Sequence, residues 1–142
     1  MKLVCLACGQ VNRIPEARIQ ARPKCGTCGA DLIKGEPTEI SLAILDKAAR
    51  TDALPLIVDF WAAWCGPCRM MAPEFAKASK ALMGAARFAK LDTEADPQAG
   101  EKYRIRGIPL LIAFQGGREI NRQTGAMPAQ NIIDWVAEMA GK

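Results

Sequence analysis

The chain has 142 residues, of which 50% are hydrophobic, enough for one ordinary domain or for a small domain joined to a larger one. No apolar run reaches the roughly 18–20 residues that span a bilayer, so we expect a soluble protein with no membrane partner. The absence of histidine excludes Cys/His nucleophilic catalysis, histidine general bases and Cys₂His₂ metal sites.

The net charge of +4 is unevenly distributed along the chain. Residues 1–35 carry six basic and two acidic residues, whereas the remainder carries thirteen of each and all eight aromatic residues. Gly35 and Pro37 punctuate the chain where the composition changes. We therefore expect two domains, covering residues 1–35 and 36–142.

Four cysteines dominate the N-terminal segment. Their layout is C-x2-C-x16-C-x2-C, a spacing typical of a four-thiolate zinc site formed by Cys5, Cys8, Cys25 and Cys28. Gly9 and Gly29 follow the two pairs, and glycine tolerates the tight turn that brings two sulfurs onto one ion. Such a site binds one Zn²⁺ and leaves no open coordination position. The ion would stabilise a segment whose few aliphatic residues are not enough to fold it.

Other interpretations of this segment remain open. The four cysteines are also compatible with two disulfides or with free thiols in a disordered leader. The basic charge permits contact with nucleic acid, but no aromatic residue is present to stack on a base, so nucleic-acid binding is not expected.

Strands and helices alternate after the boundary. We expect strands over residues 37–40, 55–62 and 87–93, and helices over 41–52, 66–84 and 95–103, with a kink at Pro73. Strand 109–115, a Gly116-Gly117 turn and residues 118–125 form a predicted hairpin, and a helix over 128–140 ends the chain. This order predicts an α/β fold with a mixed sheet flanked by helices.

A third cysteine pair, Cys65 and Cys68, lies where a buried strand meets a helix. Pro67 suits the first helical turn, and the helix N-terminus favours a thiolate on Cys65, which makes this residue the expected nucleophile. Cys68 lies one turn later on the same face and is the expected resolving thiol. The alternative is half of a metal site shared with a second chain, which the rigid proline and the preceding tryptophans disfavour.

Asp59 interrupts the otherwise apolar stretch LIVDFW. A carboxylate in a buried strand needs a partner or a proton, and Asp59 is the best candidate to exchange a proton with Cys68. Lys90 is a candidate to stabilise the ionised form of Asp59, and an ordinary solvent-facing lysine is an equally good interpretation.

Pro109 follows Ile108 at the start of an apolar strand. Because few bonds before proline are cis, the sequence alone predicts a trans bond here.

The sequence resembles thioredoxins over residues 37–142, on the motifs VDFWAAWCGPC, Pro73, KLDTE, GIP and the glycine pair at 116–117. With the two N-terminal CxxC pairs, the whole chain is similar to the zinc-containing bacterial thioredoxins, the thioredoxin 2 family. This resemblance implies a thioredoxin fold preceded by a small zinc-ribbon-like module, and activity as a protein-disulfide reductase.

The resemblance also implies roles for individual residues. Cys65 attacks a substrate disulfide, Cys68 resolves the mixed disulfide, and Asp59 and Lys90 occupy the buried proton-transfer positions. Pro109 takes the place of the family's cis-proline, and Leu110 departs from the threonine that usually follows it. The positions that match the family's substrate-binding surface are Trp61, Trp64, Gly66, Pro67, Gly107, Ile108, Pro109 and Gly125.

The resemblance further implies partners and a compartment. The substrates are disulfide-containing proteins, and an NADPH-dependent thioredoxin reductase returns the protein to its dithiol form, so no flavin or nicotinamide is bound by this chain. Because the sequence shows no leader and clusters its cysteines, we expect it in the cytoplasm.

Three alternatives compete with the reductase. An oxidant or isomerase of the same fold would need an oxidising compartment. In the second alternative, the N-terminal module binds a partner or nucleic acid and the redox domain regulates it. In the third, the N-terminal zinc site releases its ion on oxidation and so alters the reductase.

Overall fold

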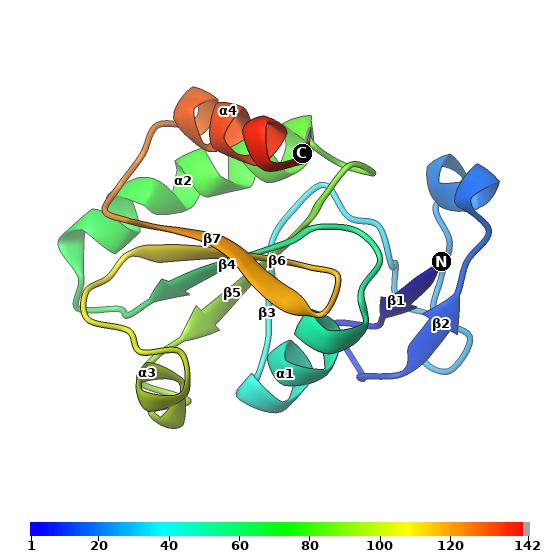
Figure 1. The fold of residues 1–142 in the computed structure, drawn as a ribbon, viewed down its shortest axis with the longest axis horizontal. Helices are drawn as coiled ribbons and strands as arrows, with labels where there is room; N and C mark the ends of the chain where they lie inside the picture. The colour runs from blue at the N-terminus through cyan, green and yellow to red at the C-terminus, as the bar shows by residue number, and fades with distance from the viewer. Residues whose placement is uncertain (141–142) are drawn as a thin grey trace.

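A two-stranded sheet precedes a five-stranded sheet that carries two helices on each face (Figure 1). This computed structural model describes residues 1–140. The elements are β1 (Lys2–Val4), β2 (Val11–Arg13), the 3₁₀ helix η1 (Glu16–Ala21), β3 (Thr38–Glu39), α1 (Leu42–Thr51), β4 (Leu56–Trp61), α2 (Gly66–Ala81), β5 (Arg87–Asp92), α3 (Gln98–Lys102), β6 (Leu110–Gln115), β7 (Arg118–Thr124) and α4 (Ala129–Ala140).

The large sheet has the strand order β3-β5-β4-β6-β7. Strands β3, β5 and β4 are parallel, whereas β6 pairs with β4 and β7 pairs with β6 in the antiparallel direction. The predicted mixed sheet is therefore confirmed. Gly116 and Gly117 connect β6 and β7 with φ values of 66° and 81°, as a tight type I′ hairpin turn requires.

Two apolar clusters fill the space between the sheet and its helices. Along β4, Val58 and Phe60 belong to the cluster under α1 and α3, whereas Ile57 packs with Met71 and Phe75 of α2. This alternation is the two-residue period of a strand buried on both faces. Asp59 therefore points to the same side as Ile57, toward α2.

The N-terminal module packs against the larger domain. Val4 and Leu6 join the cluster beneath α1, while Leu3, Ile19 and Leu32 form a separate small core within the module. In Figure 1 the module lies at the right, beyond α1, and the turn from β4 into α2 lies at the left. The four N-terminal cysteines and the CxxC pair of α2 thus lie at opposite ends of the molecule.

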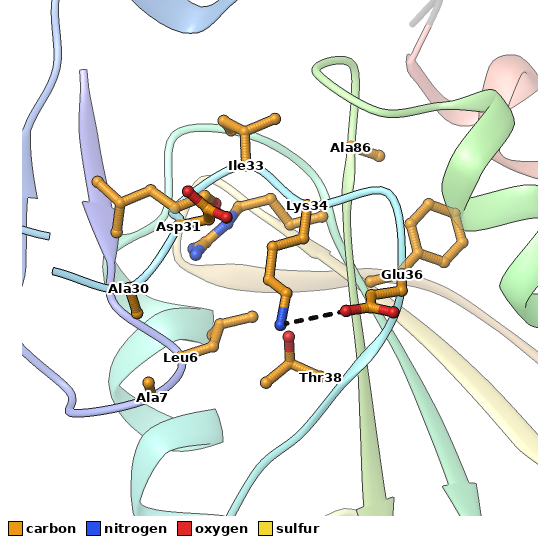
Figure 2. Close-up of a pocket in the computed structure, with 12 residues that line it drawn as sticks. Leu6, Ala7, Ala30, Asp31, Ile33, Lys34, Glu36, Thr38 and Ala86 are labelled. Carbon is orange, nitrogen blue, oxygen red and sulfur yellow. Dashed lines mark hydrogen bonds and ion pairs between the residues drawn. The ribbon is translucent and has the colours of Figure 1, made fainter. Parts of the chain in front are cut away.

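A cavity of about 40 Å³ lies where the module meets the sheet (Figure 2). The cavity is lined on one side by module residues that include Leu6 and Ala30. On the other side it is lined by Ala86, which precedes β5, and by Phe88 of β5. Lys34 and Glu36 form an ion pair of 3.8 Å at its rim. The cavity therefore lies between residues of the module and residues of the large sheet.

Element ends differ from the predictions by a few residues. Helix α2 runs through Pro73 and ends at Ala81 rather than 84, because Leu82 leaves the helical conformation and Gly84 turns the chain with a φ of 89°. Helix α3 begins at Gln98 rather than 95, because residues 93–96 form a turn closed by the Asp96 N–H on the Asp92 carbonyl. None of the helices within residues 1–140 has the length and apolarity needed to cross a membrane.

Candidate functional site

The CxxC pair lies at the start of α2, directly after β4. Cys65 is the N-cap residue, and its Sγ accepts a hydrogen bond of 3.2 Å from the Cys68 backbone N–H. The two cysteines form a disulfide with a Cα–Cα distance of 5.2 Å. The predicted position of Cys65 at the helix N-terminus is confirmed.

This position determines the chemistry available to the Cys65 sulfur. Gly66 and Pro67 occupy the first helical turn, where the missing N–H of proline costs no hydrogen bond. The unpaired N–H groups of that turn and the helix dipole favour negative charge on an N-cap sulfur. In the dithiol form Cys65 is therefore the sulfur best placed to carry a thiolate.

A second loop, containing Pro109, lies against the disulfide. The Ile108–Pro109 bond is cis, as the resemblance implied and contrary to the base-rate expectation. The Ile108 carbonyl oxygen lies 3.8 Å from Cys65 Sγ, and Gly125, with a φ of 100°, donates its N–H to the Pro109 carbonyl at 2.9 Å. Cys65, Ile108, Pro109 and Gly125 are thereby brought together from three segments.

Two neighbours of Pro109 complete this loop. A Cβ added to Gly107 would lie 3.6 Å from Thr124 Cγ2, an ordinary contact distance. Leu110, which stands where the family usually has threonine, is 2% exposed and packs in the cluster under α1 and α3. An apolar residue at this position therefore adds to the core.

The two tryptophans differ in their surroundings. Trp64 is 67% exposed, and its indole N–H donates to Glu94 at 2.6 Å. Trp61 is half-buried and packs against the cluster of Ala62, Cys65 and Cys68. Glu94 was not identified from the sequence, although its place in KLDTE, directly after a strand that lines the site, was the signal available.

Asp59 is fully buried on the α2 side of β4. Neither of its carboxylate oxygens has a hydrogen-bond partner among the described residues. Burial, with a smaller contribution from the negative charge of Glu39, raises its pKa to about 7, and the positive charge of Lys90 opposes this rise. The structure thus places a carboxylic acid that titrates near neutral pH on the strand that leads into the CxxC pair.

Lys90 is the β5 residue in register with Asp59. Its Nζ lies 4.8 Å from the centre of the Trp61 ring, and within residues 1–140 it makes no ion pair with Asp59. Lys90 therefore acts on the carboxyl group through space, in the direction expected from the sequence. Glu39, on the short edge strand β3, was missed because a two-residue strand carries no periodic signal.

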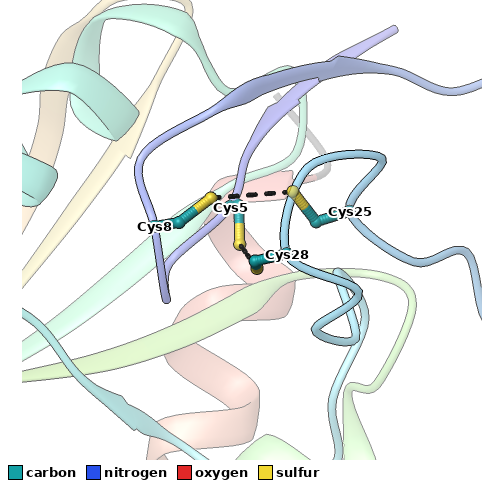
Figure 3. A group of neighbouring side chains, drawn as sticks. All are labelled: Cys5, Cys8, Cys25 and Cys28. Carbon is teal, nitrogen blue, oxygen red and sulfur yellow. Dashed lines mark hydrogen bonds between the residues drawn. The ribbon is translucent and has the colours of Figure 1, made fainter.

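The four N-terminal cysteines converge as their spacing predicted (Figure 3). The sulfurs of Cys5 and Cys28 are 3.6 Å apart, those of Cys8 and Cys25 are 3.7 Å apart, and all four lie within 4.8 Å of one another. A tetrahedral Zn²⁺ site with Zn–S bonds of about 2.3 Å would separate its sulfurs by about 3.8 Å. The cluster has the dimensions of a closed zinc site.

Backbone geometry supports the same interpretation. Gly9 and Gly29 have φ values of 85° and 78°, and each closes its knuckle by donating its N–H to the carbonyl of Cys5 or Cys25. The Cys25 sulfur also accepts hydrogen bonds from the Asn12 side chain at 3.5 Å and the Thr27 N–H at 3.4 Å. Such N–H groups around a sulfur favour the thiolate that a metal requires.

Comparison with known proteins agrees with this arrangement. The family model described as Thioredoxin matches residues 38–138, and the model described as Thioredoxin 2, N-terminal, matches residues 4–30. The second match contains all four clustered cysteines.

Individual relatives extend the likeness to nearly the whole chain. Thioredoxin C-3 of Corynebacterium nephridii is 38% identical over 136 residues, covering 96% of this chain and 93% of the relative. Thioredoxin of Synechocystis sp. is 40% identical over 90 residues, which cover 63% of this chain and 84% of that thioredoxin.

Solved structures show the same fold. Chloroplastic thioredoxin z superposes with a TM-score of 0.69 at 29% identity, covering 75% of this chain and 96% of its own. A mutant thioredoxin from Halobacterium salinarum NRC-1 gives a TM-score of 0.67 at 26% identity, covering 75% and 92% respectively. The chain therefore belongs to the thioredoxin family and is a protein-disulfide reductase that carries an N-terminal zinc-ribbon domain.

Proposed function

We propose that Cys65 and Cys68 are the dithiol that reduces protein disulfides in the cytosol, and that the N-terminal cysteines hold one structural Zn²⁺. The hydrogen bond from the Cys68 N–H to Cys65 Sγ, at the N-terminus of α2, carries this proposal. This hydrogen bond supports the assignment of Cys65 as the nucleophile, because it favours negative charge on the Cys65 sulfur.

The reaction is a two-step exchange that moves two electrons to the substrate. The Cys65 thiolate attacks one sulfur of the substrate disulfide, forming a mixed disulfide and releasing the other substrate sulfur as a thiolate. Cys68 then loses its proton to Asp59, and its thiolate attacks Cys65. This second step closes the Cys65–Cys68 disulfide and releases the second substrate thiolate, which takes up a proton.

Asp59 suits the second step because its pKa of about 7 allows it to accept and return a proton near neutral pH. Lys90 stabilises the ionised form of this carboxyl group through its positive charge. We assign proton transfer to these two residues.

The surface around Cys65 would hold the substrate chain. Exposed Trp64 and Pro67 flank the sulfur, and Ile108 contacts it from the cis-proline loop. The proposed binding residues are Trp61, Trp64, Gly66, Pro67, Gly107, Ile108, Pro109 and Gly125.

The zinc ion would be held by Cys5, Cys8, Cys25 and Cys28. A four-sulfur site has no open coordination position, so the ion supplies folding energy to the module rather than a Lewis acid to the reaction. A redox-responsive site, in which oxidation of the thiolates releases the ion, is the alternative role.

An NADPH-dependent thioredoxin reductase is the proposed source of electrons, as in the family. The cytosol is the proposed compartment because four unpaired, clustered thiols suit reducing conditions.

The test is reduction of insulin disulfides by purified protein with NADPH and thioredoxin reductase. We expect Cys65→Ser to abolish turnover and Cys68→Ser to accumulate a mixed disulfide that is visible by mass spectrometry without reducing agent. Normal turnover by Cys65→Ser would overturn the assignment of the nucleophile.

Native mass spectrometry in a series of glutathione redox buffers tests the zinc assignment. One zinc ion that stays bound while a single disulfide forms supports a structural site. Loss of zinc in step with disulfide formation supports the redox-responsive role instead.

A further inference from the structure

A row of three ionisable side chains crosses the sheet from the edge strand β3 through β5 to β4. Glu39 on β3 is in register with Lys90 on β5, and Lys90 is in register with Asp59 on β4. Residues that are paired across neighbouring strands point to the same face of a sheet, so all three side chains lie on the face covered by α2.

Exposure changes steadily along this row. Glu39 lies on the edge strand and is exposed, Lys90 is half-buried, and Asp59 is 0% exposed. Two carboxyl groups therefore flank one ammonium group, one at the solvent and one in the interior. Only Asp59 and Lys90 in this row match the family's proton-transfer positions.

We propose that Glu39 is a positioning residue for the reduction of disulfides: it shares the Lys90 ammonium with Asp59 across the sheet and limits how strongly Lys90 stabilises the Asp59 carboxylate. This inference rests on the proposed role of Asp59 as the proton acceptor for Cys68. It adds a residue at the edge of the sheet to that step.

The position of the Lys90 side chain supports this sharing. Its Nζ lies over the Trp61 ring at 4.8 Å, and within residues 1–140 it forms no ion pair with either carboxylate. The Trp61 indole N–H, which has no hydrogen-bond partner among the described residues, has a small lowering effect on the pKa of Glu39. An ammonium held over the ring acts on both carboxylates by charge alone.

The directions of the pKa shifts of Asp59 and Glu39 agree with this proposal. Burial raises the pKa of Asp59, Lys90 lowers it and Glu39 raises it. For Glu39, which is exposed as a whole residue, the partial burial of its carboxyl group raises the pKa, Lys90 lowers it and Asp92, two residues along β5 on the same face, raises it. Removing the Glu39 charge should therefore make the Asp59 proton easier to remove.

The other surroundings of Asp59 contribute little charge. Leu111 is its register partner on β6, and Met71 of α2 and Ile132 of α4 line the same cluster. Cys68 of α2 is in the disulfide and does not titrate, and Lys90 and Glu39 are the charged side chains that shift the pKa of Asp59.

The experiment measures the titration of the Asp59 carboxyl carbon by NMR in the oxidised protein, where Cys65 and Cys68 do not titrate. Two strand spacings separate Glu39 from Asp59, about 10 Å, so we expect Glu39→Gln to lower the Asp59 midpoint by about 0.5–1 pH unit. Glu36→Gln is the matched control because it also removes one negative charge from this region, at a glutamate outside the row whose side chain is 76% exposed. It should leave the midpoint unchanged.

Kinetics provide a second readout. The acidic limb of the pH profile for insulin reduction should move to lower pH by a similar amount in Glu39→Gln, and this shift should vanish in an Asp59→Asn background. An Asp59 midpoint that is the same in Glu39→Gln and Glu36→Gln, or that rises in Glu39→Gln, would overturn the inference. If the wild-type protein fails to reduce insulin at any pH, the proposed function fails while the NMR titration still decides the role of Glu39.

Discussion

Arg87 and Asp52 form an ion pair of 2.6 Å that is buried beside the N-terminal module, with side-chain exposures of 4% and 2%. Asp52 also accepts a hydrogen bond from the Val4 N–H at 2.8 Å, and Arg87 donates to the Leu32 carbonyl at 3.1 Å. Each partner therefore binds the module as well as the other charge. The pair attaches the module to the first residue of β5 and to the end of α1.

Replacing Arg87 by methionine should destabilise the protein by about 3–5 kcal/mol, because Asp52 would remain buried without a counter-charge. The change is measured as the free energy of unfolding in urea. Lys77→Ala is the control, since it breaks an exposed ion pair with Glu74 and should cost about 0–1 kcal/mol. Equal losses in the two variants would show that the buried pair does not hold the module in place.

Asp59 should make stability depend on pH between about 4 and 7. Its pKa is raised from 3.8 to about 7 by burial, so at low pH it is protonated in both the folded and unfolded states. As pH rises, the unfolded chain releases this proton first, and stability is lost until the folded protein also ionises. Asp59→Asn should therefore stabilise the protein at pH 8 by about 2–4 kcal/mol and have little effect at pH 4.

Urea unfolding of Asp59→Asn at the two pH values measures this effect. Asp134→Asn removes an exposed carboxylate of α4 and is the matched control. A stabilisation of Asp59→Asn that is the same at pH 4 and pH 8 would contradict ionisation as its cause.

Removal of zinc should loosen the N-terminal module more than the reductase site. The four sulfurs bring together the turns that enclose Leu3 and Leu32, whereas the dithiol lies at the other end of the sheet. With a zinc chelator we expect the melting temperature to fall by several degrees or more, because zinc binding supplies folding energy to the module. Insulin reduction at 25 °C should change by less than about twofold.

Calorimetry and bound-zinc analysis on the same samples measure this prediction. Cys25→Ser provides a second route to the metal-free state without a chelator. Loss of activity in proportion to zinc, with an unchanged melting temperature, would instead connect the zinc site to catalysis.

Glu94 should position Trp64 for the substrate. The 2.6 Å hydrogen bond from the indole N–H to the Glu94 carboxylate holds a ring that is otherwise largely exposed. A hydrogen bond to a charged group is worth about 1 kcal/mol or more, so Glu94→Ala should raise KM for insulin about 3–10-fold with little change in kcat. Glu101→Ala, at an exposed position of α3, is the control, and an equal KM in both variants would exclude this role.

Local patterns accounted for much of the fold and site. The C-x2-C pairs form tight knuckles because each depends on only a few neighbouring residues and a glycine with positive φ, as at Gly9 and Gly29. Likewise, an apolar strand followed by Gly66 and Pro67 was enough to place Cys65 at a helix N-terminus. Ends of elements were less certain, as at Ala81, because the last helical turn depends on how the following loop packs.

The sequence by itself determined which residue types meet at each site: four thiols in the module, two at the head of α2, and one carboxylate in a buried strand. Only the tertiary structure decided which distant residues surround them. The row of Glu39, Lys90 and Asp59 arises from strand register between segments far apart in the chain, and the Asp52–Arg87 pair from docking of the module on β5. Neither the row nor the ion pair can be recognised from a short stretch of sequence. Pairing between distant strands depends on the packing of the whole sheet and its helices rather than on the preferences of neighbouring residues.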